Sequence, residues 1–207
     1  MRRALFVLIL LTLGAGIYFL FLLPRGYDIK NYPSSGRRIV AFGDSLIEGV
    51  GATEGEDLVS VLSRTLDVSI ENYGRGGDTT ALALERLPSV LEEVPEPKAA
   101  IILLGGNDFL QKVSKEEIFG NLAKIITAFQ DRGAVVLVLG IRGGLIKDNF
   151  EGEFEQLAHR HRTAYVSNIL RGLVTNRELM FDSIHPNDKG YERIASRVAP
   201  VLKKIIE

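Results

Sequence analysis

Residues 99–108 read AAIILLGGND, an apolar run that passes directly into a cluster of Gly, Asn and Asp. A short Ile/Leu run bounded by turn residues is typical of a strand that is buried on both faces of a sheet. A second such run, VVLVL at residues 135–139, comes after a predicted helix at residues 114–132. Strands of this kind separated by a helix indicate a parallel sheet that helices cover.

The alternation of strand and helix continues in both directions from this stretch. Runs with strand character lie at residues 39–42, 68–73, 99–104, 134–139 and 164–166. Helical spacing or capping predicts helices at residues 57–66, 80–94, 114–132, 150–161 and 187–206, with one or two helices around Pro88. We therefore predict an α/β fold with a parallel sheet that is covered on both faces.

Composition excludes several functional classes. The chain has 207 residues and a formal net charge of −1, from 25 basic and 26 acidic side chains. This balance argues against a dedicated nucleic-acid binder, which usually carries a basic excess. The chain has no cysteine, which excludes disulfides, a thiol nucleophile and zinc–thiolate or iron–sulfur sites.

The amino-terminal segment is the most apolar part of the chain. Residues 4–23 contain no charge, and a helix of that length would span about 30 Å, the thickness of a bilayer core. We predict a membrane anchor at residues 1–24, a linker at 25–37 and one folded domain at 38–207. A cleaved signal peptide and a buried core helix are the alternatives for the first segment.

The charges that flank the apolar run bear on which side of the membrane the folded domain lies. Two arginines precede the apolar run, and four basic residues follow it within about 15 positions, which favours a cytoplasmic domain. A very short basic amino terminus before an apolar run is, however, the usual start of an export signal. We predict a single-pass membrane protein whose folded domain lies outside the cytoplasm.

Polar clusters follow four of the predicted strands. They lie at residues 43–45, 74–79, 105–108 and, beyond the short fifth strand and its loop, 182–185. Because ligands of parallel sheets bind beyond the carboxyl ends of the strands, we expect these clusters to meet at one edge. Each cluster alone is also typical of an ordinary turn. The prediction of a site therefore depends on all four clusters following strands of one sheet.

Two of these clusters can supply a nucleophile and its base. A serine hydroxyl such as that of Ser45 is weak until a base takes its proton. Of the three histidines, His159 and His161 lie on different faces of a predicted helix and are expected at the surface. His185 lies in a loop three residues after Asp182, whose carboxylate can fix the tautomer of the ring. We predict Ser45 as nucleophile, His185 as base and Asp182 as the residue that orients it.

Acyl transfer also needs donors for the negative charge that develops on the carbonyl oxygen. The candidates at the same edge are the backbone N–H groups of Ser45 and Gly77 and the side-chain amide of Asn107. A glycine lets the backbone approach a substrate closely, and an amide donates without carrying charge.

The four clusters together resemble the blocks of the SGNH, or GDSL, hydrolase family. They read VAFGDSL at residues 40–46, NYGRGGDT at 72–79, LGGND at 104–108 and DSIHPN at 182–187. The signature Ser, Gly, Asn and His correspond to Ser45, Gly77, Asn107 and His185, in family order. The resemblance implies a three-layer α/β/α sandwich with a five-stranded, flavodoxin-like sheet. It also implies serine catalysis that needs no metal or other cofactor.

Within that family the chain is similar to the bacterial lysophospholipase, acyl-CoA thioesterase and arylesterase branch. The resemblance implies a small acyl ester, thioester or lipid as substrate. Where the branch usually has a proline-containing loop, residues 143–145 read GGL, which leaves the chain-length preference open. Arg75 and Arg142 are candidates to meet an anionic substrate, or are solvated loop cations. The candidate pocket residues are Asp44, Asp108, Phe109, Arg142 and Leu145. The alternative for Asp108, which we favour, is that it caps a turn, and the alternative for Phe109 and Leu145 is packing in the core.

Two other functions stay open from the sequence. One is an O-deacetylase of cell-envelope carbohydrate that uses the same site. The other is a non-catalytic envelope-binding protein that retains the fold. The oligomeric state is not predicted.

Overall fold

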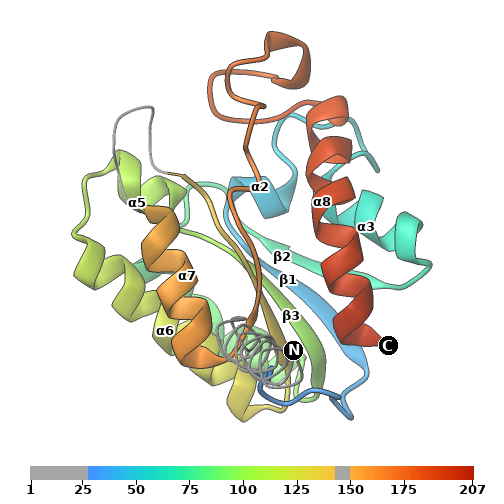
Figure 1. The fold of residues 1–207 in the computed structure, drawn as a ribbon, viewed down its shortest axis with the longest axis vertical. Coiled ribbons are helices and arrows are strands. Elements are labelled where there is room, and N and C mark those ends of the chain that lie inside the picture. The colour runs from blue at the N-terminus through green and yellow to red at the C-terminus, as the bar shows by residue number, and fades with distance from the viewer. Residues whose placement is uncertain (1–27, 143–149) are drawn as a thin grey trace, which may run out of the picture.

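A five-stranded parallel sheet forms the centre of the computed structural model, which describes residues 28–142 and 150–207 (Figure 1). The strands lie in the order β2-β1-β3-β4-β5, and all neighbouring strands are parallel. Their bounds are β1 Arg38–Gly43, β2 Ile70–Gly74, β3 Pro97–Leu103, β4 Val135–Leu139 and β5 Ala164–Val166. The predicted five-stranded parallel sheet is confirmed.

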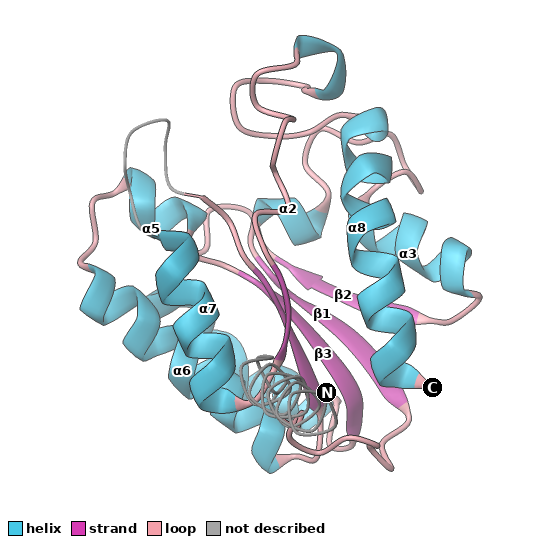
Figure 2. Cartoon of the chain, in the orientation of Figure 1, coloured by secondary structure: helices cyan, strands magenta, loops and turns pink. Residues whose placement is uncertain are grey.

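Helices cover both faces of the sheet (Figure 2). On one face, α3 (Leu58–Leu66) packs against α8 (Asp188–Ile206). On the other, α6 (Lys115–Asp131) packs between α4 (Thr80–Glu93) and α7 (Phe150–His161). Every residue of β4 is buried, as the run of Val and Leu predicts for a strand between two helical layers. The three-layer architecture is therefore confirmed.

Four of the predicted helices begin after a residue whose side chain caps them. Asp57, Thr79, Ser114 and Asn187 each accept a hydrogen bond from the first turn of the helix that follows. Such caps satisfy N–H groups that have no partner within the helix. Pro88 lies inside one continuous helix, so the region holds one helix and not two.

Three short elements were not expected from the sequence. They are α2 (Ser45–Glu48), α5 (Gly106–Leu110) and the 3₁₀-helix η1 (Arg177–Leu179). The first two follow β1 and β3 directly, within the polar clusters. They are too short for hydrophobic periodicity to signal them.

The predicted anchor at residues 4–23 lies outside the described residues. Within 28–142 and 150–207, none of the helices combines the length and the apolar character that crossing a membrane requires. The described part of the linker, residues 28–37, packs against the amino edge of the sheet. Lys30 N donates to Arg162 O at 2.8 Å, and Ser34 Oγ donates to Gly133 O at 2.8 Å, just before β5 and β4 respectively. These residues lie at the opposite end of the sheet from α2 (Figure 1).

Candidate active site

Ser45 stands at the carboxyl end of the central strand β1, as the first residue of α2. Gly43 allows this turn, because a Cβ there would lie 2.4 Å from the carbonyl oxygen of Leu103. Asp44 caps the helix by accepting from Leu46 N at 3.0 Å. The backbone N–H of Ser45 is thereby one of the N–H groups that a helix start leaves without an intrahelical partner.

His185 and Asp182 form a hydrogen-bonded chain with Ser45. The Nε2 atom of His185 lies 3.0 Å from Ser45 Oγ, and its Nδ1 atom lies 2.8 Å from Asp182 Oδ2. The other carboxylate oxygen of Asp182 accepts from the backbone N–H groups of Ile184 and His185, both at 2.7 Å. The carboxylate is therefore held by the loop that carries the histidine, and the ring is oriented toward the serine.

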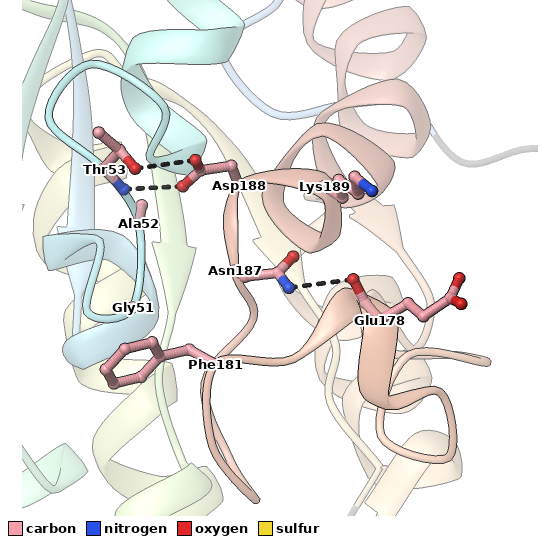
Figure 3. A pocket seen from close by; sticks show the side chains of 8 residues that line it. All are labelled: Gly51, Ala52, Thr53, Glu178, Phe181, Asn187, Asp188 and Lys189. Atoms are coloured by element: carbon pink, nitrogen blue, oxygen red, sulfur yellow. Dashed lines mark hydrogen bonds between the residues drawn. The ribbon is translucent and has the colours of Figure 1, made fainter.

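The residues that follow the His185 loop are held by side-chain hydrogen bonds (Figure 3). Asp188 accepts from Thr53, from N at 2.7 Å and from Oγ1 at 2.8 Å. Asn187 donates to Glu178 O at 3.0 Å and caps α8. A hollow of ≈ 520 Å³ lies beside these contacts and contains none of the three residues of the hydrogen-bonded chain. Its lining consists of Gly51, Ala52, Thr53, Glu178, Phe181, Asn187, Asp188 and Lys189.

The second and third polar clusters are joined by Asn107. Its side-chain nitrogen donates to Asp78 O at 2.9 Å, next to Gly77. A primary amide has two N–H donors, so one is used to fix the side chain and the second is left for a ligand. Gly77 has a φ of +82°, a conformation that other residues adopt at a cost, and its N–H makes none of the hydrogen bonds of the described residues. The turn is tied to the serine turn, because Arg75 N donates to Gly43 O at 3.0 Å.

Arg86 on α4 braces these turns and was not expected from the sequence. Its Nε lies 2.6 Å from Asp78 Oδ2, and its Nη2 donates to the strand-end carbonyls of Gly43 at 3.0 Å and Tyr73 at 2.9 Å. Its guanidinium also lies 4.3 Å from the ring centroid of Phe42. Arg86 belongs to none of the sequence motifs, and a single arginine on an amphipathic helix is normally expected to be a solvated surface side chain.

Two candidate pocket residues are buried, which corrects their expected place. Asp108 accepts from Thr80 N at 2.8 Å and from Thr80 Oγ1 at 2.6 Å, so its carboxylate binds the first residue of α4, which Thr79 caps. Asp44 lies beneath Ser45 and is 2% exposed. Both carboxylates point into the protein because each accepts from an N–H group in the first turn of a helix that starts at this edge.

The remaining described candidates, Phe109, Arg142 and Arg75, have different surroundings. Phe109 is half-buried and packs edge-on against Phe150, with ring centroids 5.4 Å apart. Arg142 is exposed and lines a separate hollow of ≈ 460 Å³. Arg75 is exposed, 3.9 Å from Asp78 Oδ1. Leu145 lies outside the described residues.

The pKa values of Asp182 and Asp44 are shifted in opposite directions. The hydrogen bond from His185, with the two backbone N–H groups, lowers the pKa of Asp182 to about 2, so the carboxylate is charged at any neutral pH. Burial raises the pKa of Asp44 to about 7, and the neighbouring Asp78 and Asp108 add to the effect. The bond from Leu46 N and the proximity of His185 oppose it.

An activated serine, an oriented histidine and a set of donors at one sheet edge are the parts of a serine ester hydrolase. Residues 41–193 match the GDSL-like lipase/acylhydrolase family, and the chain belongs to that family.

The esterase TesA of Pseudomonas aeruginosa is 30% identical over 184 residues, which cover 84% of this chain and 91% of that protein. An arylesterase of Vibrio mimicus is 31% identical over 181 residues, covering 82% of this chain and 90% of that protein. A crystal structure of TesA superposes with a TM-score of 0.76 at 29% identity, covering 82% of this chain and 99% of that one. The chain is thus a carboxylic ester hydrolase, as the sequence predicted.

Proposed function

We propose that Ser45, His185 and Asp182 are the catalytic triad of this hydrolase and that it cleaves acyl esters and thioesters through an acyl-enzyme. The observation that carries the assignment is the unbroken hydrogen-bonded chain from Asp182 through His185 to Ser45. Ser45 and His185 are 140 positions apart in the sequence, so a local turn does not account for their alignment.

The reaction follows from this geometry in two steps. In the first, Ser45 Oγ bonds to the acyl carbon while its proton passes to Nε2 of His185, which then protonates the leaving alcohol or thiol as the acyl–oxygen or acyl–sulfur bond breaks. In the second, His185 takes a proton from water, the water oxygen bonds to the acyl carbon, and Ser45 leaves with the proton. Asp182 stays charged throughout and stabilises the imidazolium that forms in each step.

The oxyanion of each tetrahedral intermediate is held by three donors in this proposal: Ser45 N–H, Gly77 N–H and the amide of Asn107. Support comes from the bond between Asn107 and Asp78 O, which fixes the amide before substrate arrives. Donors that are already oriented cost no reorganisation in the transition state.

The experiment that tests this function is hydrolysis of p-nitrophenyl esters from acetyl to palmitoyl by the full chain in detergent, with Ser45→Ala as control. We expect activity that depends on Ser45 and is highest at medium chain length. Cleavage of acetyl esters alone would favour the carbohydrate O-deacetylase. A folded chain that cleaves none of them and takes no fluorophosphonate label at Ser45 would contradict the catalytic proposal and favour a binding protein.

We also propose that residues 4–23 anchor the protein in a membrane with the hydrolase domain outside the cytoplasm. Residues 24–27 can then span no more than about 17 Å between the apolar run and Asp28. From Asp28 on, the chain packs against the amino edge of the sheet, whereas Ser45 lies at the carboxyl edge. A strand of seven residues such as β3 is about 23 Å long. In this arrangement the catalytic edge faces away from the bilayer that holds the anchor.

The absence of cysteine allows a direct test of this orientation. A dye on Leu110→Cys reports the catalytic edge and a dye on Asp131→Cys reports the amino edge, where Asp131 pairs with Lys30. In proteoliposomes that contain an acceptor lipid, we expect strong quenching at position 131 and weak quenching at position 110. Equal or reversed quenching, or protein that does not float with the liposomes, would contradict the proposal.

A further inference from the structure

A hollow with two arginines lies beside the loop that carries the triad histidine. It has a volume of ≈ 460 Å³, and its described lining comes from Arg142, from the loop after β5 and from Ser183. Its lining consists of Arg142, Asn168, Leu170, Arg171, Gly172, Val174, Thr175 and Ser183. Ser183 follows Asp182 directly, so the hollow adjoins the loop that carries His185, and its lining contains none of the triad.

Among the described residues, the lining carries two positive charges and no negative one. Neither Arg142 nor Arg171 takes part in an ion pair of the described residues, whereas Arg38, Arg64 and Arg86 each pair with a carboxylate. A third arginine lies close by: Arg197 donates to the backbone carbonyls of Ile169 and Arg171, both at 2.7 Å. Burial lowers the pKa of Arg197, and the neighbouring Arg193 and Arg171 add to the effect, which places several cations in one region.

The other lining groups suit the same kind of ligand. The hydroxyls of Thr175 and Ser183 and the amide of Asn168 can donate to oxygen, and Leu170 and Val174 offer apolar contact to the organic part of a substrate. A guanidinium presents a planar set of donors that matches the oxygens of a carboxylate or a phosphate.

We propose that Arg142 and Arg171 form a subsite for an anionic group, a phosphate or a carboxylate, on the ester that the triad cleaves. This inference rests on the proposed function, since it takes Ser45 as the nucleophile. The anion belongs to the leaving alcohol if it is a phosphate on that alcohol, and to the acyl group if it is a terminal carboxylate. In both cases the subsite selects esters with a charged group over neutral esters of the same length.

The test compares matched pairs of esters on the full chain in detergent. One pair is 2-(butyryloxy)ethyl phosphate and 2-hydroxyethyl butyrate, and the other is p-nitrophenyl hemisuccinate and p-nitrophenyl butyrate. For at least one pair we expect kcat/KM to favour the anionic member, and Arg142→Met or Arg171→Met to reduce that preference about 10-fold, the effect of losing one hydrogen bond to a charged group. The pair that responds identifies the source of the anion.

Arg177→Met is the matched control, because Arg177 is an exposed arginine on the neighbouring 3₁₀-helix and does not line this hollow. A preference that falls equally in Arg177→Met, or is absent in the unsubstituted chain, would overturn the subsite. Titration calorimetry measures the binding of 2-(butyryloxy)ethyl phosphate and of hemisuccinate amide to Ser45→Ala. This measurement distinguishes failure of the subsite proposal from failure of the triad proposal. Binding that Arg142→Met abolishes supports the subsite even if no ester is hydrolysed, and hydrolysis without anion binding refutes it alone.

Discussion

Replacement of Arg86 by methionine would remove the only basic partner that the described residues place within 3 Å of the Asp78 carboxylate. Asp78 is 2% exposed, so water does not replace the lost ion pair. Breaking a buried pair from one side costs about 3–5 kcal/mol of folding free energy. The carbonyls of Gly43 and Tyr73 also lose a donor. We expect Arg86→Met to lower the free energy of unfolding by about 4 kcal/mol, which corresponds to a fall in Tm of roughly 10 °C for a domain of this size.

Urea unfolding followed by circular dichroism measures this change, and two further variants make it specific. Arg64→Met removes an exposed pair with Glu56 and should cost less than about 1 kcal/mol. Asp78→Asn combined with Arg86→Met leaves no buried charge unpaired, so it should be more stable than Arg86→Met alone. A loss below 1 kcal/mol in Arg86→Met, or a double variant no more stable than the single one, would refute the reasoning.

The same substitution should also reduce catalysis at temperatures where the variant is folded. Arg86 holds the carbonyl of Gly43 from one side, and Arg75 N holds it from the other. Asn107 is fixed through the backbone of Asp78. We expect kcat to fall at least tenfold with a smaller change in KM, because the donors of the oxyanion are displaced and not the substrate pocket. An unchanged kcat would show that the brace stabilises the fold without positioning the site.

Three further predictions concern the residues around Ser45. Asp182→Asn should lower kcat by about 10⁴, because the amide no longer fixes the tautomer of His185, and steady-state kinetics with unchanged KM would check it. Asn107→Ala should lower kcat about 10²–10³-fold through loss of one oxyanion donor, with the unfolding free energy as a control for its bond to Asp78. Asp44 has a pKa raised to about 7, so the folded state binds its proton more tightly than the unfolded state, and this contribution to stability is lost as the pH rises from about 4 to 7. Asp44→Asn keeps the acceptor for Leu46 N and should therefore gain stability relative to the unsubstituted chain over that range, by urea unfolding at each pH; a difference that does not vary with pH would contradict it.

The strands could be predicted from the sequence because burial on both faces determines their composition locally. Parts of the site could not, because they depend on contacts between distant elements. The strand at 135–139 is buried on both faces, so its composition alone marks it. The capping residues Ser114 and Asn187 likewise mark helix starts locally. Arg86 could not be found in this way, because its role depends on a carboxylate from another element that only the tertiary fold brings near. For Asp108 the sequence favoured a local turn cap over a pocket, but it could not name Thr80, the partner on another element that draws the carboxylate inward.

The parallel sheet also links the proposed membrane anchor with the proposed anionic subsite. All strands point the same way, so the edge that gathers the triad is necessarily remote from the edge against which residues 28–37 pack. An enzyme tethered through the latter edge meets esters that arrive through water more readily than acyl chains buried in its own bilayer. A charged group keeps an ester in water, and Arg142 and Arg171 line the hollow that includes Ser183, on the loop that carries His185. Cleavage of a soluble anionic ester in preference to a lysolipid in the same liposome is therefore the substrate pattern that both features favour.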